Sequence, residues 1–241
     1  MMRILEKYRI FEVFRKINVE PLLFLLSFGD GILRLPVMDL VLSKTCLSGS
    51  SLFGEKIFSE DICSNLTSYP AEQAVVQATV SKFNSVSEVI SGILTILVTI
   101  FLGSWCDSGA RKGLIYLSII GRLSRVISLL FNYVHKELVI EYFWLDFLHY
   151  LCGNNNSLFI GALAIITDDT STEIRTIRIL IISGVFETGL ALSNLVSGYF
   201  LEYRTFYASL ATYFALVILA LLYTILSTII QPRGEKIFIK R

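Results

Sequence analysis

The chain has 241 residues, of which 54% are hydrophobic, and a formal net charge of +1. Soluble domains are about 45–50% apolar even when glycine is counted, so this composition predicts a membrane protein. The charge balance gives no reason to expect nucleic acid as a partner, and four cysteines are too few for a disulfide scaffold.

The N-terminal segment, residues 1–20, carries charged residues throughout its length. It therefore lacks the apolar centre and the small-residue end of a cleavable signal peptide. We expect a basic cytoplasmic segment here, and we expect the first membrane helix to direct the chain to the membrane.

Six apolar stretches follow that are long enough, at roughly 20 residues each, to cross a hydrocarbon core. They are residues 21–42, 86–106, 114–133, 142–167, 176–199 and 206–230. Helix is expected because lipid-exposed backbone must satisfy its own hydrogen bonds, and these stretches lack the alternation of barrel strands. We therefore predict an all-α membrane protein with six transmembrane helices over residues 21–230, an outer loop at 43–85 and a cytoplasmic tail at 231–241.

The distribution of lysine and arginine predicts the orientation. With the N-terminus inside, thirteen basic residues fall in cytoplasmic segments and five in outer segments. Because cytoplasmic loops carry the excess of basic residues, we expect both termini to be cytoplasmic. The loop at 43–85 then lies outside.

This outer loop contains two features typical of the exterior or a lumen. Asn65, followed by Leu66 and Thr67, forms a glycosylation sequon. Cys46 and Cys63 share the same oxidising side and could form a disulfide, remain free thiols or bond to another chain.

Charged residues inside the predicted spans are the strongest site candidates, because each costs about 2.5–3.5 kcal/mol at a helix centre on insertion scales. Asp30 and Arg34 are four residues apart on the first helix, so they share a face and can neutralise each other. The third span carries a polar stripe that should face protein or water. Its members are Ser118, Gly121, Arg122, Arg125 and Ser128.

Glu187 and Arg125 each lie eleven residues into an outward-running span, which places both about 16 Å deep. They could meet near the midplane, either as a protonation switch or as a permanent pair that ties two helices together.

His149 in the fourth span could titrate near neutral pH or simply be packed. Asn155 and its two neighbours could bind substrate or form hydrogen bonds between helices.

A short charged turn separates the second and third spans. Asp107 and Arg111 lie within it, between Gly103 and Gly113. Such a turn between two apolar stretches is typical of a cytoplasmic hairpin in a carrier. A carboxylate and a guanidinium placed there could join and release helix ends, or form an ordinary solvated loop.

Several motifs together resemble the N-terminal half of solute carrier family 46, a proton-coupled folate transporter-like family of the major facilitator superfamily. The motifs are Val19-Glu20-Pro21-Leu22, Cys63-Ser64-Asn65, Gly103-x-Trp105-x-Asp107 with Arg111, and Asp168-x-Thr170-Ser171-x-x-x-Arg175-Thr176-x-Arg178. Ser183 stands where the folate-transporting members of that family have an acidic residue implicated in proton coupling.

The resemblance implies a six-helix half of a carrier, in which the two cytoplasmic loops control the side toward which the cavity opens. It assigns this gating role to Asp107, Arg111, Asp168, Arg175 and Arg178. The second charge cluster, Asp168 with Arg175 and Arg178, is expected to pair with the first hairpin. The substrate or proton path would involve the residues inside the spans: Asp30, Arg34, Arg122, Arg125, His149 and Glu187.

The leading hypothesis is a secondary transporter, or half-transporter, for a polar or anionic organic solute. The resemblance implies that the solute is folate-like and that its transport is coupled to protons. A second half-transporter or a second copy would supply the missing wall of the path. The alternative is a truncated membrane protein that binds or regulates a partner without transporting. We expect that the protein is not an enzyme and uses no cofactor or metal. We expect it to lie in the plasma membrane or an endolysosomal membrane.

Overall fold

The computed structural model describes residues 19–52, 58–107, 111–203 and 206–230. Within these ranges the chain forms helices and no strand. The elements in chain order are α2 (Glu20–Ser48), α3 (Glu60–Ser64), η1 (Leu66–Ser68), α4 (Pro70–Asp107), α5 (Arg111–Val134), η2 (Ile140–Asp146), α6 (Phe147–Leu151), α7 (Asn154–Asp169), α8 (Thr172–Glu202) and α9 (Phe206–Ile230).

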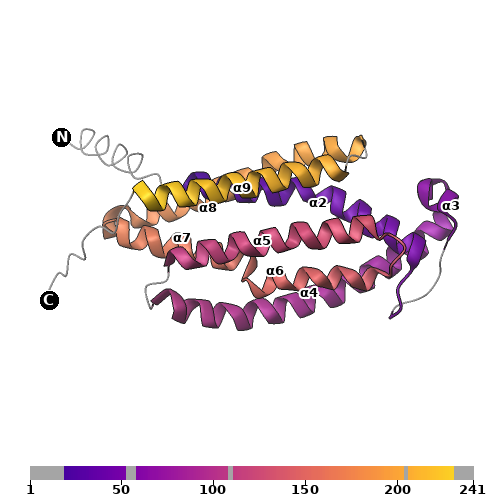
Figure 1. The fold of residues 1–241 in the computed structure, drawn as a ribbon, viewed down its shortest axis with the longest axis horizontal. Helices are drawn as coiled ribbons and strands as arrows, with labels where there is room; N and C mark the ends of the chain where they lie inside the picture. Colours follow the sequence, from indigo (N-terminus) through magenta and orange to yellow (C-terminus); the bar gives the residue numbers. More distant parts are fainter. Residues whose placement is uncertain (1–18, 53–57, 108–110, 204–205, 231–241) are drawn as a thin grey trace.

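Five of these helices, α2, α4, α5, α8 and α9, are long and apolar enough to cross a membrane. The chain is therefore an all-α, multi-pass membrane protein. Figure 1 shows α2, α8 and α9 along one side of an elongated bundle, and α4, α5, α6 and α7 along the other. The two sides meet where α5 packs against α9 and α2 packs against α4.

The limits of α2 follow from its sequence. Pro21 stands in the first turn, where its fixed φ suits a helix and its missing N–H leaves no bond unmade. Gly49 follows the last residue with a φ of 66°, and its N–H donates to the Thr45 carbonyl at 2.9 Å. With a ψ of −160°, this is a backbone conformation that essentially only glycine adopts, so Gly49 suits the point where the helix ends.

The fourth predicted span, residues 142–167, is not one continuous helix, so the count of six is not confirmed. It is divided among η2, α6 and α7, and the break lies at Gly153 and Asn154, whose φ values are 82° and 46°. A Cβ on Gly153 would lie 2.5 Å from Leu102 Cδ1 and 2.9 Å from Ser157 Cβ. The turn therefore depends on glycine, and α7 alone has only 16 residues.

The segment at 43–85, expected as an outer loop, is largely helical at its two ends. Helix α2 continues to Ser48, and α4 begins at Pro70. Val76, Val80 and Phe83 in this early part of α4 are buried at helical spacing. Their apolar packing extends the helix beyond the stretch that hydropathy alone selects.

A disulfide between Cys46 and Cys63 joins the end of α2 to the end of α3. The Cα atoms of the two cysteines are 5.7 Å apart. A hydrogen bond from the Phe58 N–H to the Cys46 carbonyl, 3.1 Å long, holds the same segment against α2. The short helix α3 and the η1 turn are therefore fixed over the end of the bundle at which α2 ends.

The same end of α2 is bound to the segment that follows α5. Lys44 is fully buried, and its Nζ donates to Asn132 Oδ1 at 2.9 Å and to the His135 carbonyl at 3.0 Å. Ser50 Oγ donates to Glu141 Oε1 at 2.6 Å. Partial burial raises the pKa of the Glu141 carboxyl, but the hydrogen bonds from Ser50 and the nearby backbone outweigh it, so the pKa lies below its ordinary value.

Helices α2 and α8 share the most extensive interface of the bundle, and small residues make it possible. A Cβ on Gly31 would overlap the Ser193 side chain, and one on Gly189 would overlap Ser27 Oγ. Ser197 Oγ also accepts a hydrogen bond of 3.1 Å from the Leu35 N–H, beside the internal Pro36 of α2. The two backbones consequently lie in close contact.

We predict that Gly31→Val and Gly189→Val each destabilise the protein by about 1–3 kcal/mol, because the added side chain must separate two packed helices. Gly184→Val in α8 is the matched control, since a Cβ there has nothing within 4 Å. Thermal unfolding of the purified protein in detergent measures the difference. Equal unfolding temperatures for all three variants would contradict this packing.

Candidate functional site

The centre of the bundle contains an arginine with no exposure to solvent. Arg122 on α5 donates through Nη2 to Asp30 Oδ2 on α2 at 2.9 Å and to Asn155 Oδ1 on α7 at 2.6 Å. Its Nη1 donates to Ser118 Oγ, one turn earlier on α5. One guanidinium thus connects three helices.

Asp30 has a second partner on a fourth helix. The Tyr213 hydroxyl on α9 is fully buried and donates to Asp30 Oδ1 at 3.2 Å. Arg122, Asp30, Asn155, Ser118 and Tyr213 are called the Arg122 cluster below. Since a buried charge is tolerated only when it is paired and hydrogen-bonded, these contacts hold α2, α5, α7 and α9 in one arrangement.

The expected pair between Asp30 and Arg34 does not form in the described structure. Asp30 pairs with Arg122, and Arg34 is exposed. The spacing of four residues permitted the local pair. A guanidinium that another helix buries completely must find a carboxylate, whereas an exposed arginine can reach water or headgroups.

A second ion pair lies beside the Arg122 cluster. Arg125 Nε on α5 is 3.4 Å from Asp146 Oδ2 at the end of η2, and both side chains are largely buried. The fully buried His149 follows on α6, and it lies against Gly121 of α5. Gly121 lets α6 approach α5, since a Cβ there would lie 2.7 Å from Cys152 Cβ.

The predicted meeting of Glu187 with Arg125 is also absent from the described structure. Glu187 lies on the exposed face of α8, as Ser183 does, and Arg125 pairs with Asp146. Equal depth in the membrane does not determine which way a side chain points. Helix α8 buries Phe186 and Gly189 against its neighbours, and this orientation turns Glu187 outward.

The two cytoplasmic loops of the prediction are joined by one ion pair. Arg111 at the start of α5 contacts Asp168 near the end of α7, and both side chains are substantially exposed. Arg175 Nη2 donates to the Thr167 carbonyl at 3.0 Å. Asp107 is exposed at the end of α4, and none of the ion pairs in the described ranges includes it.

Arg178 does not join Asp168 and Arg175. It is buried against α2, where its Nη2 donates to Glu20 Oε1 at 2.6 Å, and the two side chains are 1% and 5% exposed. Glu20 Oε2 also accepts from the Val19 N–H at 3.0 Å. Helical spacing explains the difference, because Arg178 follows the buried Ile174 by four residues on α8.

Four of the six charged or titratable residues predicted for a solute or proton path come together: Asp30, Arg122, Arg125 and His149. The sequence had offered Asn155 as a residue that binds substrate or forms hydrogen bonds between helices, and it had not marked Asp146 or Tyr213 as site residues. A tyrosine in the middle of an apolar helix is itself a signal, because its buried hydroxyl needs a partner. Among the described residues, no group of three or more His, Cys, Asp or Glu side chains is arranged to hold a metal ion.

We predict that Arg178→Gln destabilises the protein by about 3–5 kcal/mol, because it leaves the Glu20 carboxylate buried without its guanidinium. Arg175→Gln is the control from the same helix, with an expected loss of about 1 kcal/mol for its single hydrogen bond to a carbonyl. Thermal unfolding in detergent compares the two. If Arg178→Gln were no more harmful than Arg175→Gln, the buried pair would have no stabilising role.

Comparison with known proteins gives one informative similarity. The chain is 27% identical over 189 residues to the proton-coupled folate transporter of Bos taurus. The matched region covers 78% of this chain and 40% of that transporter, so the chain spans less than half the length of the relative. No family model matches the chain. No solved structure matches it.

Proposed function

We propose that the chain is a six-helix half of a major facilitator-type secondary transporter for a polar or anionic organic solute. The observation that carries this proposal is the Arg122 cluster, a fully buried arginine paired inside a membrane bundle. Ionisable groups in membrane spans are costly and usually belong to a substrate or ion path. The similarity to a folate transporter supports a solute of the folate type and coupling to protons.

The solute path runs past the Arg122 cluster and the Arg125–Asp146 pair. The guanidiniums supply a positive field for an anion, and His149 is the proton-exchanging group beside them. Its ring is fully buried, and the charged side chains of Asp30, Arg122 and Arg125 lie around it. Proton coupling through Glu187 is not part of this proposal, because Glu187 lies on the opposite, exposed face.

The ion pair between Arg111 and Asp168 acts as the cytoplasmic gate. It joins the α4–α5 hairpin to the end of α7, and its exposed position lets it form and break with little loss of free energy. Asp107 and Arg175 lie on the same two loops and exchange with this pair as the gate opens. Arg178 anchors α8 to α2 during the movement.

A second bundle completes the transporter, either as a second copy of the chain or as a partner. The exposed Glu187 and Ser183 on α8 support this, because polar groups facing lipid are costly and a second bundle would cover them. Both termini lie on the cytoplasmic side, and the exposed Asn65 is glycosylated on the other. The membrane is the plasma membrane or an endolysosomal membrane.

Uptake of radiolabelled folate into liposomes containing the purified protein tests the proposal. We expect uptake above that of protein-free liposomes, and faster uptake when the outside is more acidic. Arg111→Asp and Asp168→Arg each place like charges together and abolish most of the uptake, while the two changes combined restore the pair. Lys112→Gln, an exposed neighbour, leaves uptake unchanged.

Absence of uptake with or without a pH gradient contradicts the transport proposal for this chain. Recovery of a second membrane protein with such an inactive chain would then support the alternative of a partner-binding protein. Uptake that survives Arg111→Asp would remove the gate from the proposal while leaving transport in place.

A further inference from the structure

A cavity of about 350 Å³ lies at the outer end of the bundle, away from the Arg122 cluster and from the cytoplasmic ion pair. We call it the outer pocket. Its lining comes from α2, α3, η1, α4, α9 and the end of α5 with the segment just after it. The volume lies within the range of roughly 300–1,000 Å³ that is typical of small-molecule sites.

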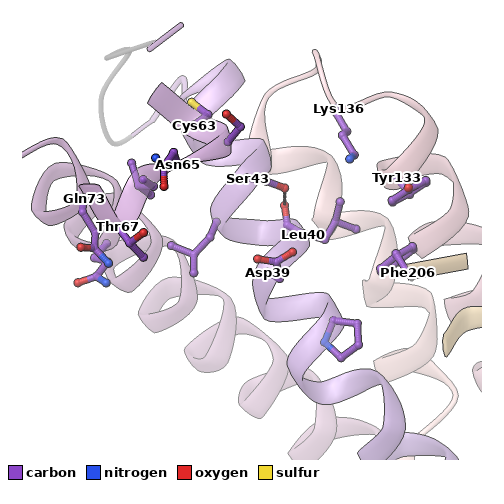
Figure 2. A pocket seen from close by; sticks show the side chains of 15 residues that line it. Asp39, Leu40, Ser43, Cys63, Asn65, Thr67, Gln73, Tyr133, Lys136 and Phe206 are labelled. Carbon is purple, nitrogen blue, oxygen red and sulfur yellow. Dashed lines mark hydrogen bonds between the residues drawn. The ribbon is translucent and has the colours of Figure 1, made fainter. Parts of the chain in front are cut away.

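The outer pocket contains one negative and one positive side chain that do not pair with each other. Asp39 on α2 is exposed, and Lys136 follows the end of α5. Neither belongs to an ion pair in the part of the chain that the structure describes, and Figure 2 shows the two at different places on the pocket wall. A ligand that carries both charges would satisfy both residues at once.

An aromatic surface lies next to the lysine. The rings of Tyr133 and Phe206 stack in parallel, with centroids 4.5 Å apart and an interplanar angle of 5°. Lys136 Nζ lies 4.5 Å from the centre of the Tyr133 ring. The pocket therefore offers an apolar face directly beside its positive charge, which suits a carboxylate attached to an apolar group.

Neutral polar groups line the opposite side. Figure 2 shows Thr67 and Gln73 across the pocket from Tyr133 and Phe206, and Gln77 lines the pocket as well. Amide side chains both donate and accept hydrogen bonds, so they suit the peptide or amine groups of a ligand. The Cys46–Cys63 disulfide holds this side in place, because Cys63 itself lines the pocket. A site fixed in this way requires little ordering when a ligand binds.

We propose that the outer pocket binds a small zwitterion, an amino acid or a short peptide with an apolar side chain. The ligand carboxylate contacts Lys136 and its ammonium contacts Asp39, while its apolar group lies against Tyr133. This binding site is separate from the path assigned to the Arg122 cluster and does not depend on transport by the chain.

Calorimetric titration of the full chain in lipid nanodiscs tests the proposal with phenylalanine and glycyl-phenylalanine as probes. Each probe has two matched derivatives, one acetylated at the amine and one amidated at the carboxylate, so that one charge is removed at a time. We expect at least one zwitterion to bind. Each of its two derivatives should bind with an affinity at least about tenfold lower, as loss of one charged hydrogen bond predicts.

Variants of the protein test the same contacts by removing the charges of the pocket instead of those of the ligand. Asp39→Asn and Lys136→Gln should each weaken binding of the zwitterion about tenfold. Asp61→Asn and Lys82→Gln are the controls, because both side chains are exposed and lie outside the pocket lining. The combined exchange Asp39→Lys with Lys136→Asp should recover binding, since a zwitterion can reverse its direction.

The proposal is overturned if neither zwitterion binds at millimolar concentration. It is equally overturned if the singly charged derivatives bind as tightly as the zwitterion, or if Asp39→Asn and Lys136→Gln behave as the controls do. The derivatives report on the unaltered protein, so the outcome does not depend on the folding of any variant.

Discussion

The complete burial of the Arg122 guanidinium is the constraint on which the arrangement of the helices depends. A buried charge without partners would cost several kcal/mol, so α2, α7 and α9 must bring Asp30, Asn155 and Tyr213 to the same place. These contacts fix the rotation of each helix about its axis. The close packing of α2 on α8 through Gly31 and Gly189 then determines how the remaining helices surround this centre.

The ion pairs of the structure fall into two physical classes. The Asp30–Arg122 and Glu20–Arg178 pairs are buried, and breaking either one leaves an uncompensated charge at a cost of about 3–5 kcal/mol. The Arg111–Asp168 pair is exposed, and such pairs contribute about 0–1 kcal/mol. Under the proposed function, the buried pairs keep the bundle rigid while the exposed pair opens and closes.

The sequence predicted the long helices well, because an uninterrupted apolar stretch leaves helix as the only stable choice in lipid; the predicted bounds of α9 agree with the structure. It also identified Arg122 and Asp30 as exceptional. It could not predict partners across helices, since spacing and depth do not give the rotation of a helix, and the pairings proposed for Arg34 and Glu187 failed for this reason. The break at Gly153 and Asn154 consists of two backbone conformations with positive φ, which hydropathy does not report.

A double-mutant cycle between Asp30 and Arg122 tests the central role of the buried pair most directly. The free energy of unfolding is measured in detergent for Asp30→Asn, Arg122→Gln and the combined variant. The account predicts that each single change is strongly destabilising and that the combined loss is smaller than the sum of the two, with a coupling energy of about 1–3 kcal/mol. Additive losses, with no coupling between the two positions, would contradict it.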